Sequence, residues 1–206
     1  MMPRGALWSG DNPLILASAS RIRRALIEAT GIPVEVEAAD IDERALEYAL
    51  GPRGPREVAA NLSAAKAVAV SALHTTRYVL GADQTLEVAG RQLNKPQSRR
   101  EAADHLVLLS GRKHQLHSGL ALAINGHTVW SHVETATLHV RPLSGSFIHD
   151  YLDAAGDDVM LSVGAYQIEG LGMHLFDRIE GDHTTIMGLP ILPLLRQLRN
   201  MGLLAD

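Results

Sequence analysis

The sequence contains no cysteine, and this absence removes several classes of protein. Without Cys among the 206 residues, disulfide scaffolds, zinc fingers, iron–sulfur clusters and thiol nucleophiles are excluded. Aromatic residues are scarce, at 4% of the chain, whereas 46% of the residues are hydrophobic. A chain of this length can bury about 70% of its unfolded surface without covalent crosslinks. The composition therefore predicts an ordinary globular protein with one large domain or two small lobes.

Long hydrophobic runs and an excess of positive charge are missing as well. No 18 consecutive residues are apolar, which argues against a membrane span, and the N-terminus lacks the pattern of a secretion signal. Together with the lack of cysteine, this favours a cytoplasmic protein. The 19 basic and 23 acidic residues give a net charge of −4, which argues against broad binding of DNA or RNA. We therefore expect any polyanionic partner to be small and bound locally.

The first half of the chain alternates between strand and helix signals. Residues 13–17 and 78–83 are short apolar runs of the kind found in buried strands. Between and after them, apolar residues recur at helical spacing. This spacing predicts helices over residues 20–30, 55–73 and 98–110.

The second half favours antiparallel strands. Asn125-Gly126 is a strong hairpin signal, and residues 115–124 and 128–140 on either side of it alternate between apolar and polar side chains. Further predicted elements are a helix over 144–156, an extended stretch over 173–179 and a last helix over 189–201. We expect an α/β fold with a mixed, twisted sheet and two lobes that meet at a cleft. Residues 1–12 are expected to form a flexible extension and residues 13–206 a single domain.

The turn from the first strand into the first helix is a candidate anion site. Ser18 and Ser20 precede Arg23 and Arg24. Free backbone N–H groups at a helix start, two hydroxyls and guanidinium groups together suit a phosphate. The alternative is a serine N-cap followed by surface arginines, which is a common arrangement.

Carboxylates follow two of the predicted strands. Asp40, Asp42 and Glu43 form an acidic segment, and Asp83 ends the strand over 78–83. Such hard oxygen ligands suit Mg²⁺, which takes one or two carboxylates together with phosphate oxygens of a substrate. An acidic loop can equally be a solvated one. Asp83 is the stronger candidate, as a metal ligand or a general base, because ligands bind at the ends of such strands.

Eight short motifs are spread over the chain from about residue 14 to residue 202. They are Ser18-x-Ser20 with Arg23-Arg24, Ile41-Asp42-Glu43, Ala65-Lys66-Ala67, Gly81-Ala82-Asp83-Gln84, Leu93-x-Lys95-Pro96, Leu109-Ser110-Gly111-Arg112-x-His114, Gly164-Ala165-Tyr166-x-Ile168-x-Gly170 and Ile186-Met187-Gly188-Leu189-Pro190. Each motif is weak alone, but the set in this order is specific and resembles the Maf family of nucleoside triphosphate pyrophosphatases. Two positions depart from the family pattern, with Arg21 in place of Pro and Asn94 in place of Gly.

The resemblance implies a fold, a reaction and a set of site residues. The fold is that of the inosine-triphosphate pyrophosphatase type (Maf/Ham1), an elongated α/β molecule with a central nucleotide cleft. The reaction converts a nucleoside triphosphate and water into the monophosphate and pyrophosphate, with Mg²⁺ or Mn²⁺. Asp83 would act as base or hold the metal, and Glu43 would help to hold the metal. The expected phosphate ligands are Ser18, Ser20, Arg23, Lys66 and Lys95.

Three positions associated with base choice in this family correspond to Ile22, Gln84 and Glu169. Members that resemble the dTTP/UTP enzymes carry Arg, Thr and Gln there, whereas those that resemble the 7-methyl-GTP enzymes carry Trp, Gln and Glu. A carboxylate such as Glu169 can accept hydrogen bonds from the N1–H and the amine of guanine. Ile22, however, cannot stack on a base as Trp does. The pattern favours a modified purine such as 7-methyl-GTP, with dTTP/UTP as the alternative.

Two further expectations complete the interpretation. A non-catalytic, nucleotide-binding regulator of septum formation and cell division is the rival function, but retention of the acids and lysines favours catalysis and a house-cleaning role. The alternating strands after Gly119 could pair in a homodimer. The histidine pairs His114 and His117, and His127 and His132, lack the spacing of metal ligands. We expect these histidines to be exposed or structural.

Overall fold

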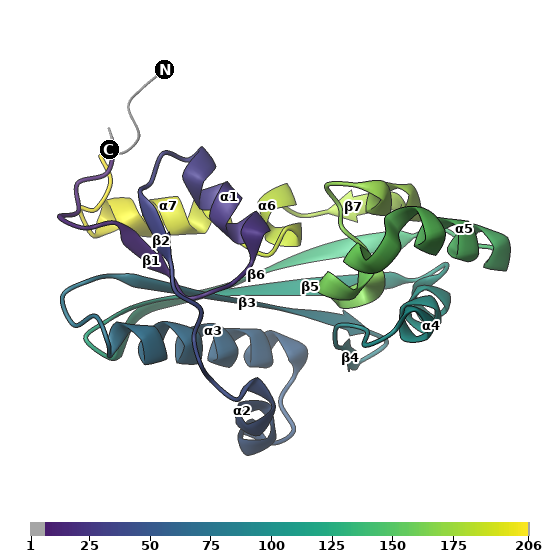
Figure 1. Ribbon diagram of the computed structural model, residues 1–206, viewed down its shortest axis with the longest axis horizontal. Helices are drawn as coiled ribbons and strands as arrows, with labels where there is room; N and C mark the ends of the chain where they lie inside the picture. The colour runs from purple at the N-terminus through teal and green to yellow at the C-terminus, as the bar shows by residue number, and fades with distance from the viewer. Residues whose placement is uncertain (1–6, 206) are drawn as a thin grey trace. The chain divides into compact units, whose positions relative to one another are not determined.

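The computed structural model describes residues 7–205 and contains a seven-stranded sheet with helices (Figure 1). The strands follow the order β2-β1-β3-β5-β6-β7, and β4 pairs with β3. The pairs β1–β2 and β1–β3 are parallel, whereas β3–β4 and β6–β7 are antiparallel. This confirms the predicted α/β class with a mixed sheet. The strands are β1 (Leu14–Leu16), β2 (Val34–Val36), β3 (Val79–Val88), β4 (Arg91–Leu93), β5 (Lys113–Ile124), β6 (His127–Val140) and β7 (Phe176–Glu180).

Seven α-helices and three 3₁₀ segments occur within residues 7–205. No helix of this part of the chain is long and apolar enough to cross a membrane. The helices are α1 (Arg21–Ala29), α2 (Glu43–Leu50), α3 (Pro55–Ser71), α4 (Arg99–Leu109), α5 (Gly145–Ala155), α6 (His183–Ile186) and α7 (Ile191–Asn200). The 3₁₀ segments are η1 (Gly156–Leu161), η2 (Val163–Ala165) and η3 (Leu171–Leu175).

The chain divides into two compact units. Unit 1 comprises residues up to 83, residues 118–134 and residues from 188 onward. Unit 2 comprises residues 84–117 and 135–187. Each unit has its own hydrophobic core.

In unit 1, helices cover both faces of the strands. Figure 1 shows α3 on one side, and α1 and α7 on the other. Successive side chains of a strand point to opposite faces, so Leu14 and Leu16 pack in the cluster that includes α1 and α7, whereas Ile15 and Ala17 pack with α3. The continuous apolar run that predicted a buried strand therefore reflects two covered faces.

The α3 face is built from very small residues. A Cβ on Gly81 would lie 2.0 Å from the carbonyl oxygen of Ser63, and one on Gly119 would lie 2.3 Å from that of Ala59. Any larger side chain at these two strand positions would collide with the backbone of the helix. The glycines thus allow α3 to lie directly on β3 and β5.

Aromatic and histidine side chains contact one another in the core of unit 2. His114 is buried, and its Nε2 lies 2.6 Å from the hydroxyl of Tyr166. The Tyr166 ring meets Phe176 edge-on at 4.9 Å between centroids. His117 is also buried, 2.9 Å from Thr135 Oγ1 and 3.2 Å from a carboxylate oxygen of Glu87. Of the two histidine roles expected from the sequence, these two residues take the structural one.

The expected extended stretch over 173–179 is wrong in its first part. The strand β7 begins only at Phe176, and residues 171–175 form η3. Met173 and Leu175 have the alternating spacing of a strand, but Met173 is exposed. Gly172 packs closely against the backbone of Gln167. The close backbone approach at Gly172 favours a tight turn over an extended strand.

The two ends of the described chain meet in unit 1. Trp8 and Leu204 form an antiparallel bridge, and the N–H of Ser9 donates to the carbonyl of Leu203 at 3.0 Å. Trp8 also donates from its indole to the carbonyl of Asn12 at 3.0 Å. Of the N-terminal stretch expected to be flexible, residues 1–6 lie outside the described residues.

Candidate active site

The turn from β1 into α1 brings the two predicted serines and Arg23 together. Ser20 is the N-cap of α1, and its hydroxyl accepts from the backbone N–H of Arg23 at 3.3 Å. Ser18 is buried, and its hydroxyl accepts from the backbone N–H of Ser20 at 3.4 Å. The helix start and the two hydroxyls thus lie together in one turn, and its binding of an anion stays a prediction.

Arg23 is held in place by hydrogen bonds within the protein. Its Nη1 donates to Ser18 Oγ at 3.1 Å and to the carbonyl of Ala82 at 2.8 Å. Its Nε donates to the carbonyl of Gly188 at 2.9 Å. Burial lowers the pKa of Arg23, and the negative charges of Asp83 and Glu43 oppose this effect. Arg23 therefore links β3, at Ala82, to the serine turn.

A largely buried lysine contacts both carboxylates that the sequence singled out. Lys66 Nζ lies 2.6 Å from Asp83 Oδ1 and 2.9 Å from Glu43 Oε1. The side chains of Lys66 and Asp83 are only 12% and 11% exposed, whereas Glu43 is 49% exposed. The arrangement is a charge cluster in which Lys66 and Asp83 are shielded from solvent and Glu43 is accessible to it.

Three different elements position this cluster. Asp83 lies within β3, Lys66 on α3 and Glu43 at the start of α2. The prediction that the strand ends at Asp83 is wrong, because the strand continues to Val88 and pairs there with β4. The close packing at Gly81 brings the backbone of α3 to the strand that carries Asp83. Asp42 caps α2 by accepting from the N–H of Ala45 at 2.9 Å, which fixes Glu43 as the first helical residue. Asp42 therefore has a structural role.

Burial raises the pKa of Asp83, because desolvation disfavours its charged form. The positive charges of Lys66 and Arg23, and the hydrogen bond from Lys66, oppose this rise. The net direction is upward, which brings the carboxylate closer to the range in which it can accept a proton.

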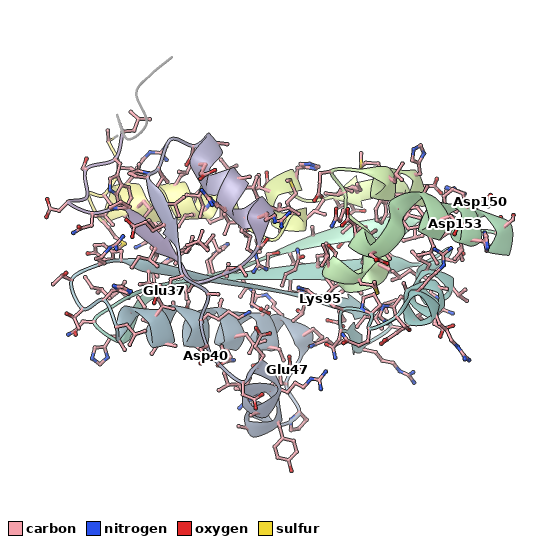
Figure 2. All side chains as sticks on the ribbon, in the orientation of Figure 1. Glu37, Asp40, Glu47, Lys95, Asp150 and Asp153 are labelled. Atoms are coloured by element: carbon pink, nitrogen blue, oxygen red, sulfur yellow. The ribbon has the colours of Figure 1, made fainter. Side chains whose placement is uncertain are left out.

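The carboxylates of Asp83 and Glu43 supply some, but not all, of the ligands that a hard divalent cation needs. Within residues 7–205, no group of three or more His, Asp or Glu side chains could hold a metal ion. Asp83 and Glu43 supply carboxylate oxygens, and Mg²⁺ typically takes one or two carboxylates and completes its shell with water and phosphate oxygens. These two residues therefore fit a metal that arrives with a triphosphate. Asp40, labelled in Figure 2, is exposed.

The other predicted site residues have different surroundings. Ile22 is half-buried on α1 of unit 1. Gln84 is in unit 2, where its amide nitrogen donates to the carbonyls of Thr185 and Ile186 at 3.1 and 3.0 Å. Lys95 (Figure 2) and Glu169 are exposed residues of the same unit.

The backbone partners of Arg23 are contacts at the candidate site that sequence reasoning missed. The carbonyls of Ala82 and Gly188 each receive a hydrogen bond from its guanidinium. Both residues lie within motifs of the sequence, but a carbonyl group is present at every position. The motif boundaries were therefore the only signal that could have pointed to them.

Comparison with known proteins agrees with the motifs. The family model described as Maf-like protein matches residues 13–201. The chain is 52% identical over 200 residues to a nucleoside triphosphate pyrophosphatase of Nitrobacter winogradskyi, covering 97% of this chain and 99% of the relative. It is 51% identical over 191 residues to a 7-methyl-GTP pyrophosphatase of Rhizobium meliloti, covering 92% and 96%.

Among solved structures, a HAM1 protein of Coxiella burnetii is similar with a TM-score of 0.42 and 18% identity, covering 62% of this chain and 72% of that one. The sequence matches, in contrast, extend over nearly the whole chain at about half identity. The chain therefore belongs to the Maf family.

Proposed function

We propose that this chain is a nucleoside triphosphate pyrophosphatase, which hydrolyses a nucleoside triphosphate to the monophosphate and pyrophosphate. The observation that carries the proposal is the cluster of Lys66, Asp83 and Glu43 in the same unit as the serine turn held by Arg23. A carboxylate pair, a lysine and an anion-binding turn are the parts that phosphoryl chemistry needs. The names of the relatives support the same reaction.

In the proposed reaction, a water molecule attacks the α-phosphorus, and the bond from this phosphorus to the bridging oxygen breaks. Asp83 takes the proton of the water, and its raised pKa favours this role. The backbone and hydroxyls of the Ser18 to Ser20 turn bind phosphate oxygens. Lys66 and Arg23 stabilise the negative charge that develops on the leaving pyrophosphate. Lys95 stays a predicted phosphate ligand.

A divalent cation, Mg²⁺ or Mn²⁺, is part of the proposal. Asp83 and Glu43 would hold it, and when bound it would neutralise phosphate charge and favour the ionised form of water. The fit of two carboxylates to such an ion, completed by substrate oxygens, supports this assignment.

We further propose that a modified purine such as 7-methyl-GTP is the preferred substrate. Glu169 is an exposed carboxylate that can accept two hydrogen bonds from a guanine edge. Gln84 turns its amide nitrogen toward two backbone carbonyls, which fixes the orientation of its side chain. One relative at 51% identity carries the name 7-methyl-GTP pyrophosphatase. A preference for dTTP or UTP is the alternative.

A pyrophosphate-release assay over 7-methyl-GTP, ITP, dTTP and UTP with Mg²⁺ or Mn²⁺ tests the proposal. We expect release that the Asp83→Asn variant lowers by roughly 10²–10⁴-fold, while nucleotide binding by that variant stays within a few-fold of the wild type. Asp104→Asn, an exposed acid on α4, is the matched control and should keep the wild-type rate.

The outcomes separate the alternatives. Full activity of Asp83→Asn would refute the role of Asp83, and a clear preference for dTTP would refute the choice of base. Nucleotide binding by the wild type without any pyrophosphate release would favour the non-catalytic regulator of cell division. The cytoplasmic location, the house-cleaning role and the homodimer stay predictions.

A further inference from the structure

Lys66 occupies the place between the two carboxylates where a cation would be expected. Its ammonium group contacts one oxygen of Asp83 at 2.6 Å and one oxygen of Glu43 at 2.9 Å. With a side chain only 12% exposed, the ammonium group has given up most of its water and is solvated by these carboxylates. Removing it from them without a replacement would leave two acids facing each other.

We propose that Lys66 is an internal counter-ion that competes with the divalent metal for Asp83 and Glu43, so that metal binding becomes strong only when a triphosphate accepts the released lysine. This inference rests on the proposed function of the site. It assigns to Lys66 a second role, which precedes its contact with the substrate.

The structure provides one fixed and one movable cation. Arg23 donates to two backbone carbonyls, of Ala82 and Gly188, which cannot follow a ligand. Lys66 contacts the carboxylate side chains of Asp83 and Glu43, and its ammonium ends a flexible four-carbon stem with three rotatable donors. Lys66 can therefore exchange its partners, whereas Arg23 stays in place.

The partner helix is equally suited to an exchange. The helix α2, which carries Glu43, contains no buried residue. Glu43 itself is half exposed, so its contact with Lys66 lies at the open side of the cluster. Few buried contacts are typical of segments with low local stability. Releasing Glu43 from Lys66 thus requires little rearrangement of the core.

The exchange couples metal and nucleotide. While Lys66 contacts Asp83 and Glu43, the metal cannot bind between them. The apparent affinity for the metal alone is therefore lowered in proportion to the small fraction of molecules in which Lys66 has left the two carboxylates. A triphosphate draws the ammonium away and restores the affinity, and by reciprocity the metal strengthens binding of the triphosphate.

Binding of Mn²⁺ alone, measured at pH 8 by the electron paramagnetic resonance of the free ion, tests the competition. Lys66→Met removes the charge and keeps most of the side-chain volume, and we expect it to bind Mn²⁺ at least about tenfold more tightly than the wild type. Lys66→Arg keeps the charge and should not gain affinity. Lys113→Met, an exposed lysine on β5, is the matched control and should bind as the wild type does.

Lys66→Gln provides a second neutral variant, in case Lys66→Met does not fold by circular dichroism. Equal or weaker Mn²⁺ binding by the folded neutral variant would overturn the inference, and so would a gain in affinity for Lys113→Met. Pyrophosphate release by the same wild-type preparation is measured in parallel. Activity without the gain in affinity refutes the competition alone, whereas absence of activity refutes the proposed function.

The movement of Lys66 can be observed directly, because the chain has only three lysines, Lys66, Lys95 and Lys113. With ¹³C at the lysine Cε, substitution of each lysine assigns its resonance. Adding Mg²⁺ with inorganic tripolyphosphate should shift the Lys66 resonance, and the Lys113 resonance should stay. An unchanged Lys66 resonance at saturation would contradict the proposed exchange of partners.

Discussion

His114 is a titratable side chain that the core of unit 2 keeps neutral. It is 1% exposed, its Nε2 contacts the Tyr166 hydroxyl, and its Nδ1 has no hydrogen-bond partner among the described residues. Burial lowers the pKa of His114 to about 4, and the nearby His139 adds to the effect. A second ring proton would thus bring a positive charge into the core, where Nδ1 has no partner to solvate it.

The pH dependence of stability follows from this lowered pKa. The unfolded chain protonates His114 near pH 6.5, whereas the folded protein resists protonation down to about pH 4. The contribution is therefore complete above pH 6.5 and is lost as the pH falls from about 6.5 to about 4, by up to roughly 3 kcal/mol. Urea unfolding between pH 8 and pH 4.5 should show this decline in the free energy of unfolding.

A variant without a titratable group isolates the effect of His114. The free energy of unfolding of His114→Gln should depend less on pH over this window, whatever its absolute value. His127→Gln replaces an exposed histidine and should retain the wild-type slope. If His114→Gln and the wild type lose stability in parallel, His114 is not the group responsible.

Residue types could be predicted at the site, but their partners could not. The acids and the serine turn carry recognisable chemistry, and the family resemblance adds Lys66 to the candidates Asp83 and Glu43. Nothing in their spacing shows that one ammonium bridges both acids, since the three residues come from three elements. Pairing of this kind depends on tertiary packing.

At the scale of elements, the contact of α3 with β3 decides the position of Lys66. Lys66 lies on α3 between Ser63 and Ala67, the two residues that a Cβ on Gly81 would meet at 2.0 Å and 2.7 Å. Both contacts are with backbone atoms, which cannot rotate away as a side chain can. A methyl group at this position would therefore push the helix off the strand and carry Lys66 away from Asp83.

We expect Gly81→Ala to lower the free energy of unfolding by roughly 1–3 kcal/mol, the usual cost of overpacking. Pyrophosphate release should fall further than the folded fraction does, because the lysine is displaced in the molecules that still fold. Urea unfolding and kcat/KM on the same preparation measure the two effects.

Gly145→Ala is the matched control for this substitution, because nothing lies within 4 Å of a Cβ at Gly145, on α5. It should leave the activity unchanged and stability within about 1 kcal/mol of the wild type. Wild-type kcat/KM in Gly81→Ala would contradict the role of the close packing.

The longer helices with a buried face were predictable, whereas the short helices α2 and α6 were not. The helices α1, α3, α4, α5 and α7 carry apolar residues at helical spacing, and each has buried residues. The hairpin turn also formed as predicted, with positive φ at Asn125 and Gly126. The helix α2 was not predicted: its apolar residues Leu46 and Leu50 do recur at helical spacing, but the segment has only eight residues and none of them is buried.

At the scale of the whole molecule, each compact unit is assembled from segments that are distant in the sequence. Unit 1 combines the beginning, the middle and the end of the chain, and unit 2 combines two segments. The mixed sheet could be predicted from the alternating strand and helix signals and from the hairpin. The division into two units could not be predicted, because it depends on which distant segments pack together.

The meeting of the chain ends in unit 1 makes a prediction about global stability. Leu204, at 8% exposed, bridges Trp8 and belongs to the same core cluster as α7. Leu204→Ala should therefore lower the free energy of unfolding by about 2 kcal/mol, near the low end for a buried leucine because a chain end can partly collapse into the space. Trp8 and Trp130 both pack against this cluster, so tryptophan fluorescence during urea unfolding reports the change.

Leu192→Ala is the matched control, because Leu192 on α7 is 63% exposed. This variant should stay within about 0.5 kcal/mol of the wild type. Equal midpoints for the two variants would show that the paired ends do not contribute to the stability of the unit.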